Sequence, residues 1–206
     1  ESLDLSTLAT VLESDDPRYL HVKDPLIIYH RGESRLGFCT HPFNWASSNS
    51  GVARLTGSVV EDPDFTFFPR GFAWDVAISR LTGVTPVPKV GAFGSRDDLA
   101  LVFYDGGESM RNLDEHKMSV SRPRGYSCEE LGGLAVASRP DLSDVERVST
   151  VLPEFVSPYG SGSSRYIQAF ETSHGLIALW QQSQPDFSQA LVLNKLTSEE
   201  VKAVLS

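Results

Sequence analysis

The chain has 206 residues, 40% of them hydrophobic and 22% charged, which is enough to bury the core of one domain. No apolar run reaches the roughly 18 residues of a membrane-spanning helix. The net charge of −9 argues against a nucleic-acid partner, because such binding depends on a basic face. We expect no membrane or nucleic-acid partner, and the start of the sequence shows no signal-peptide pattern. The sequence leaves the compartment and the oligomeric state open, self-association included.

Both ends of the chain have the pattern of a short helix. In DLSTLATVLE, apolar residues recur at helical spacing and predict a helix over about 4–13. In LTSEEVKAVL, Thr197 or Ser198 can cap a helix whose first turn carries Glu199 and Glu200. We therefore predict a second helix over about 197–205.

Between these ends, short β-rich runs alternate with glycine- and proline-bearing turns. PLIIYH and RLGFCTH flank the turn RGES and predict a hairpin. A second hairpin is predicted around the turn ETSHG, in RYIQAFETSHGLIALWQQS. The prediction is a single β-rich domain over residues 1–206.

A faint repeat suggests how the strands are arranged. DPLIIYHRGESRLGFCTH, VGAFGSRDDLALVFYDGG and RYIQAFETSHGLIALWQQS each resemble the central hairpin of a larger unit. Units of roughly 40 to 50 residues are typical of propeller blades. We predict an all-β fold, a β-propeller of about four to five blades, with a β-sandwich as the alternative.

Two of these stretches resemble known carbohydrate-active proteins. HVKDPLIIYHRGESRLGFCTH is similar to the first-blade signature of β-propellers of the arabinanase and fructosidase type. SGSSRYIQAFETSHGLIALWQQSQPD is similar to a last-blade hairpin of sialidase-like proteins, although the Asp-box turn of true sialidases is absent. The resemblance implies a glycoside hydrolase whose inner strands surround a sugar-binding pocket.

A glycosidase needs two carboxylates, one protonated as the acid and one ionised as the base or nucleophile. Asp24, at the start of a predicted inner strand, is the candidate base, or else a turn residue before Pro25. Asp75 lies in an apolar strand and is either catalytic or paired with Arg70 or Arg80. Glu130, beside Glu129, and Glu171 are the candidate acids.

Arginines and tyrosines support an alternative chemistry on acidic sugars. Guanidinium groups bind a substrate carboxylate bidentately, and in sialidase-like sites a tyrosine attacks the sugar. A lyase of uronic-acid polymers would instead use histidine or tyrosine to move protons. The candidate catalytic residues are Asp24, Asp75, Glu130, Glu171 and Tyr126, and the candidate substrate-binding residues are His30, His41, Arg111, Arg122, Arg124, Arg165, Tyr166 and Trp180.

The stretch 103–133, FYDGGESMRNLDEHKMSVSRPRGYSCEELGG, is flanked by predicted strands and has mixed charges. Long loops in compact domains are usually functional or disordered. We interpret this stretch as an insertion that brings Arg, Tyr, His and Glu to the mouth of the pocket.

No cofactor is expected, although a structural calcium ion at EDPD (61–64) stays open. Cys39 and Cys128 could form a disulfide, which their number alone does not decide. The leading hypothesis is a glycoside hydrolase with a carboxylate acid/base mechanism and a carbohydrate ligand. The alternatives are a non-catalytic carbohydrate-binding or interaction propeller and a uronate lyase.

Overall fold

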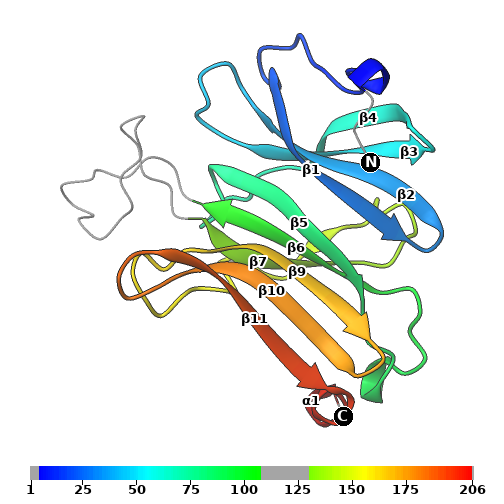
Figure 1. Cartoon of the computed structure of the whole chain (residues 1–206), viewed down its shortest axis with the longest axis vertical. Coiled ribbons are helices and arrows are strands. Elements are labelled where there is room, and N and C mark those ends of the chain that lie inside the picture. The colour runs from blue at the N-terminus through cyan, green and yellow to red at the C-terminus, as the bar shows by residue number, and fades with distance from the viewer. Residues whose placement is uncertain (1–4, 108–129, 206) are drawn as a thin grey trace.

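The computed structural model describes residues 5–107 and 130–205, and within them the chain is mostly β-strand. The strands form three antiparallel sheets that follow one another from the N-terminal to the C-terminal side of the molecule (Figure 1). The first sheet has the order β1 (His21–His30), β2 (Glu33–His41), β3 (Asn49–Thr56), β4 (Val59–Phe68). The second has β5 (Ile78–Pro86), β6 (Ala100–Gly107), β7 (Leu131–Ala137), β8 (Glu146–Arg147). The third has β9 (Ser164–Thr172), β10 (Gly175–Ser183), β11 (Gln189–Thr197).

Local sequence explains the tight hairpins. Arg31 and Gly32 connect β1 to β2 with φ of 50° and 86°, the left-handed pair that two-residue hairpin turns require. Gly57, with φ of 61°, serves the turn between β3 and β4. The predicted hairpins around RGES and ETSHG are therefore present, the second as β9 and β10.

Two apolar layers join the three sheets. Between the first and second sheets, Ile28 and Phe68 pack with Trp74, Leu81 and Tyr104. Between the second and third sheets, Phe103 from β6 meets Ile167 and Ala169 from β9. Burial of these large side chains holds the sheets face to face, because each Phe, Leu or Ile contributes roughly 1.5–3 kcal/mol when fully buried.

Hydrogen bonds between sheets bring the edge strands β1, β5 and β9 together. Thr82 and Thr85 on β5 donate their hydroxyl hydrogens to the carbonyls of Ile167 and Ala169 on β9, at 2.8 and 2.5 Å. Ser50 on β3 accepts from the backbone N–H of Leu81 at 2.7 Å. Strand β1 also contacts β5. The starts of the three edge strands consequently lie at one end of the molecule.

The helices are short. A 3₁₀ helix, η1 (Leu5–Thr7), stands where a helix over 4–13 was predicted. Leu8 and Val11 remain 66% and 56% exposed, and only Leu12 of this segment packs against a core cluster, that of Leu36, Phe38 and Ala53, among the residues whose side chains are described. A second 3₁₀ helix is η2 (Gly91–Phe93). The C-terminal helix α1 (Ser198–Leu205) matches its prediction.

The cap of α1 follows its sequence pattern. Thr197 Oγ1 accepts from the Glu200 N–H at 3.2 Å, and the Glu200 carboxylate accepts from the Thr197 N–H at 2.7 Å. This reciprocal pair is a capping box.

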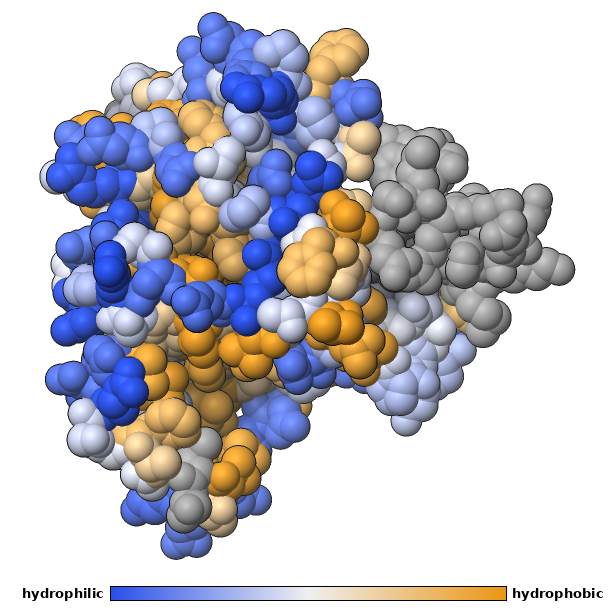
Figure 2. All heavy atoms as spheres, turned by 180° about the vertical axis from the view of Figure 1, so that it is seen from behind, coloured by the Kyte–Doolittle hydropathy of each residue, from blue (hydrophilic) through white to orange (hydrophobic). Residues whose placement is uncertain are grey.

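The surface mixes polar and apolar groups. Figure 2 shows, on the back of the molecule, apolar side chains gathered toward the middle between polar margins. The connection from β8 to β9 exposes several apolar residues, Val148, Val151, Leu152 and Val156. Among the residues described, no helix is long and apolar enough to cross a membrane.

Candidate functional site

Backbone irregularities mark the beginnings of the edge strands β1 and β9. The register of β1 shifts between Lys23 and Leu26, where Asp24 has a φ of 53°. The pairing of β9 with β10 shifts opposite Tyr166, whose φ is 59°. Bulges re-aim side chains and are frequent beside active sites. Left-handed non-glycine residues also concentrate at functional sites, because their strain persists only where the surroundings impose it.

Arg80 on β5 is the centre of a buried charge cluster. Its Nη2 lies 2.6 Å from the carboxylate of Asp105, which is the residue directly opposite on β6. The same nitrogen lies 3.1 Å from Glu130 Oε1, and Nη1 lies 3.3 Å from Asp24 Oδ2. One guanidinium therefore gathers three carboxylates from two different sheets.

The third sheet completes this arrangement. Arg165 Nη1 donates to Glu130 Oε2 at 2.6 Å, and its Nε donates to Gln181 at 2.5 Å. The backbone N–H of Tyr166 donates to Asp105 at 2.9 Å. The guanidinium of Arg80 lies over the Tyr166 ring, 4.4 Å from its centroid. We call this group the central cluster: Asp24, Arg80, Asp105, Glu130, Arg165 and Tyr166.

Members of the central cluster differ in their access to solvent. The Asp24 side chain is 33% exposed, whereas those of Glu130 and Asp105 are 7% and 0% exposed. Tyr166 is 45% exposed. Asp24 and Tyr166 are therefore the members of the cluster most exposed to solvent, and Glu130 lies deeper.

Burial shifts the pKa values of two members of the cluster. Loss of solvation raises the pKa of Asp105 to about 7, although Arg80 opposes this shift. For Arg80, burial disfavours the charge, but the carboxylates of Glu130 and Asp105 outweigh it and its pKa is raised. Arg80 therefore stays charged, while Asp105 can hold a proton near neutral pH.

An aromatic group borders Asp24 on the first sheet. His41 lies opposite His21 in the register of β1 and β2, and both rings contact Trp45 with centroid distances of 4.8 and 4.1 Å. Burial lowers the pKa of His41 to about 4, and the charge of Lys23 adds to this effect. His41 is therefore a neutral imidazole at pH 7.

Asp75 lies outside the central cluster, in a second ion network that we call the Asp75 network: Asp75, Tyr104 and Arg147. Asp75 is 0% exposed, and Arg147 Nε donates to it at 2.8 Å. The Tyr104 hydroxyl lies 3.3 Å from Asp75, and burial followed by the Asp75 charge raises the pKa of Tyr104. Asp75 was expected to be catalytic or paired with Arg70 or Arg80, but in the structure its partner is Arg147, while Arg80 pairs with Asp105.

Three further candidates lie away from the central cluster. Glu171 is exposed near the far end of β9, six residues from Arg165 and hence roughly 20 Å along the strand. His30, at the far end of β1, is 3% exposed, and neither ring nitrogen finds a partner among the described residues. Trp180 packs against Phe103 in the core between the second and third sheets.

The remaining site candidates lie outside the described residues. So does the part of the predicted insertion that runs from 108 to 129. Gly107 and Glu130, which flank the undescribed stretch 108–129, lie at the same end as the central cluster. Cys39 is a buried free thiol whose Sγ lies 2.9 Å from Ser48 Oγ. The site and disulfide candidates in the undescribed stretch are Arg111, Arg122, Arg124, Tyr126 and Cys128.

Sequence reasoning missed Arg80, Asp105 and Gln181 as site residues. Each is a polar residue within an otherwise apolar strand, as in ISRLTGV and LVFYDGG. A buried polar group requires a partner, so these positions carried a signal, but only the structure shows that Arg80 pairs with Asp105 and Gln181 with Arg165.

Comparison with known proteins bears on the fold. No family model matches the sequence, and no curated protein matches it. Among solved structures, the chain is similar to a complex of BT0996 with RGII, with a TM-score of 0.59, 10% identity, and coverage of 93% of this chain and 57% of that one. It is also similar to an α-L-arabinofuranosidase from Lactobacillus brevis, with a TM-score of 0.58, 7% identity, and coverage of 92% and 55%.

An endo-arabinase from Bacteroides thetaiotaomicron is similar at a TM-score of 0.52 and 14% identity, over 86% of this chain and 56% of the other. The fold is that of carbohydrate-active β-propellers. The predicted all-β propeller class and the resemblance to arabinanase-type proteins are confirmed at this level. The chain spans little more than half the length of these structures.

The described residues form three sheets, where about four to five blades were predicted. The chain forms fewer units than predicted because the second unit, which contains the second sheet, is long. Its strands run from Ile78 to Arg147, since residues 108–129 and the connection before β8 are included. Only the first unit, from His21 to Phe68, has the predicted length.

Proposed function

We propose that this chain carries a glycosidase-type site, in which the central cluster cleaves a neutral glycoside. The observation that supports this proposal most is the meeting of Asp24, Asp105 and Glu130 on the single guanidinium of Arg80. This contact limits the Asp24 and Glu130 carboxyl groups to within roughly 10 Å of each other, the separation over which paired carboxylates flank a glycosidic bond.

In the proposed reaction, Asp24 is the base. Arg80 and Lys23 lie 3.3 and 3.4 Å from its carboxylate, and its partial exposure lets it reach a water molecule. Asp24 removes a proton from water while the water oxygen bonds to the sugar carbon. The glycosidic C–O bond breaks at the same time.

Glu130 is the acid of this proposal. It shares Arg80 Nη2 with Asp105, and burial lets Asp105 keep a proton up to about pH 7. In this reaction, Glu130 must carry the proton that it delivers to the leaving oxygen. Asp105 itself is fully buried and does not contact the sugar.

A neutral substrate agrees better with the site than an acidic one. Among the described residues of the cluster, Arg80 and Arg165 both bind carboxylates of the protein. Neither is free to hold a sialic-acid or uronate carboxylate, as a sialidase or uronate lyase would require. The structurally similar proteins whose names concern arabinan make arabino-oligosaccharides the first substrates to test.

The experiment is turnover of neutral oligosaccharides, measured as the release of reducing ends. Substitutions Asp24→Asn and Glu130→Gln should each lower the rate by about 10²- to 10⁴-fold, the usual contribution of a general acid or base. The melting temperature of each variant controls for folding. Full activity in the folded Asp24→Asn protein would overturn the assigned role.

A non-catalytic carbohydrate-binding protein is the second candidate. It is favoured by one observation: Glu130 is held by two guanidiniums, an arrangement that also serves a purely structural charge. Saturable sugar binding without any turnover, unchanged in the Glu130→Gln variant, would support this candidate.

A further inference from the structure

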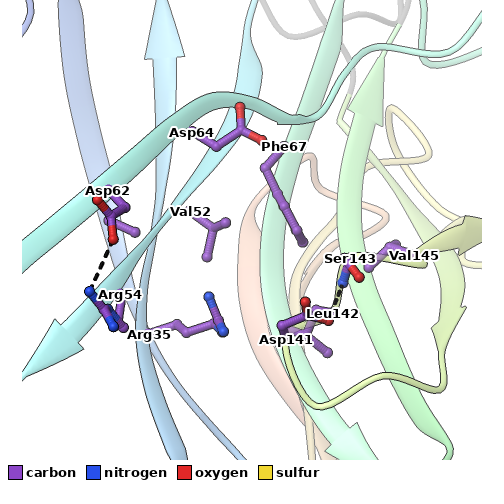
Figure 3. A pocket seen from close by; sticks show the side chains of 11 residues that line it. Arg35, Val52, Arg54, Asp62, Asp64, Phe67, Asp141, Leu142, Ser143 and Val145 are labelled. Carbon is purple, nitrogen blue, oxygen red and sulfur yellow. Dashed lines mark hydrogen bonds and ion pairs between the residues drawn. The ribbon is translucent and has the colours of Figure 1, made fainter.

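A second pocket lies on the side of the molecule, away from the central cluster. It has a volume of about 470 Å³ and separates the first sheet from the segment 138–145 that follows β7 (Figure 3). That size is within the usual range of ligand pockets, roughly 300–1,000 Å³. We call it the lateral pocket, and the lining residues used below are Arg35, Asp64, Phe67, Asp141, Leu142 and Ser143.

The lateral pocket and the central cluster are separate sites. Arg35 on β2 lies opposite Ile28 in the register of β1. Ile28 is four residues from Asp24, a distance of roughly 13 Å along the strand. One small ligand therefore cannot occupy both places.

Arg35 directs its guanidinium group toward this pocket. Its side chain is 15% exposed, and its Nη2 donates to Glu33 at 2.5 Å. Its Nε has almost no accessible surface, so a ligand in the pocket would not reach this atom. Figure 3 shows the Arg35 guanidinium directed across the pocket toward Asp141 and Leu142, so its outer nitrogens are the donors that a ligand would meet.

Acceptors and an apolar wall face this donor. Asp141 accepts from the Ser143 N–H at 3.1 Å, and Asp64 stands on β4 on another side of the pocket (Figure 3). The Phe67 side chain points into the pocket, and Leu142 lies in the opposite wall. The pocket thus combines donors, acceptors and C–H surface in one cavity.

The balance of charge disfavours an anion. Arg54, also in the lining, is paired with Glu61 and Asp62 at 3.1 and 3.0 Å, and Arg35 is paired with Glu33 at 2.5 Å. The carboxylates of Asp64 and Asp141 would repel an anion. Their oxygens can accept hydrogen bonds from a neutral molecule with many hydroxyl groups.

We propose that the lateral pocket binds one sugar residue of a neutral oligosaccharide. Arg35 donates hydrogen bonds to its hydroxyl oxygens, and Asp141 and Asp64 accept from its hydroxyl groups. The C–H face of the ring packs against Phe67. Among neutral molecules with many hydroxyl groups, the choice of a sugar rests on the proposed function. Binding in the lateral pocket would hold a polysaccharide near the central cluster.

The test measures binding of neutral oligosaccharides by isothermal titration calorimetry and by amide chemical shifts. We expect shift changes at Val52 and Ser143, and Ser143→Trp, which fills the pocket from an exposed position, should abolish the change at Val52. Arg35→Leu should weaken the same binding at least tenfold. Ser58→Trp, in the exposed turn between β3 and β4, is the matched control and should change nothing.

These readouts do not depend on catalysis. If the chain shows no turnover but Ser143→Trp abolishes the shifts, the lateral pocket stands and the proposed function fails. Absence of shifts at Val52 and Ser143, or shifts that survive in Ser143→Trp, would overturn the lateral pocket. Larger shifts with acetate than with sugars would also overturn it, because they would identify an anion site.

Discussion

Two buried ion networks lie on either side of β6, and they differ in how far their members are exposed to solvent. Asp105 points toward the third sheet and joins the central cluster, while the next residue, Gly106, adjoins Asp75 on the other face. A Cβ atom at Gly106 would lie only 2.6 Å from Asp75 Cβ. The Asp75 network is closed by packing, whereas the central cluster exposes Asp24 and Tyr166.

This contrast shows what distinguishes a candidate site from a structural ion pair. Both networks contain a fully buried carboxylate, an arginine and a tyrosine. The central cluster also lies at the bulged starts of edge strands, where three sheets meet. The Asp75 network has one carboxylate and one guanidinium, and the Arg147 guanidinium lies 4.0 Å from the centroid of the Phe68 ring. A buried charge alone therefore says little about catalysis.

Removal of one arginine from each network gives the largest expected difference. Arg147→Met leaves Asp75 buried without a cation and should cost about 3–5 kcal/mol of unfolding free energy. Arg165→Met leaves Glu130 with Arg80, so the loss should be about 1.5–3 kcal/mol, that of one charge-assisted hydrogen bond. Denaturant unfolding measures both values. Equal losses would mean that the networks do not differ in the way proposed.

Turnover should rank these two variants in the opposite order from stability. Arg147→Met should keep its turnover at temperatures where it is folded, whereas Arg165→Met should lose turnover because Glu130 is no longer positioned. A loss confined to Arg147→Met would place the reaction at Asp75.

The pH dependence of stability gives a smaller, signed effect. Because burial raises the pKa of Asp105 to about 7, folded protein keeps a proton that the unfolded chain releases above about pH 4. The contribution of Asp105 to stability is thus present at low pH and lost as the pH rises through about 7. The amide that replaces this carboxyl group in the Asp105→Asn variant has no such proton.

The melting temperature of the wild type, relative to Asp105→Asn, should therefore fall between pH 5 and 8. Each kcal/mol corresponds to about 2–4 °C for a chain of this size. The lowered pKa of His41 makes stability rise with pH instead. This effect is common to both proteins, so it cancels in the difference between their melting temperatures. A constant difference across this range would show that Asp105 is ionised throughout.

Glu171→Gln should have the smallest effect. It is the control for removing a carboxylate that lies away from the central cluster. Glu171 is exposed near the end of β9 opposite the central cluster. Turnover should change by less than about twofold, and stability by less than about 0.5 kcal/mol, as for other surface substitutions. A strong loss of turnover would restore Glu171 as the acid and remove that role from Glu130.

The sequence by itself determined the β class, the hairpins and the C-terminal cap. These depend on neighbours in the chain: the Arg31–Gly32 turn, the alternation of apolar residues, and the pairing of Thr197 with Glu200. It also pointed to Asp24, Glu130, Arg165 and Tyr166, because strand starts and polar residues beside apolar runs are visible locally.

Only the tertiary structure decided how these residues combine. Arg80 and Asp24 are 56 residues apart and Arg165 and Glu130 are 35 apart, so no local pattern relates them. The same packing paired Asp75 with Arg147, 72 residues away. It also left Leu8 and Val11 exposed, so the predicted N-terminal helix did not form around them. Charges in a core find partners through the packing of distant strands, and that packing separated a candidate site from a structural ion pair.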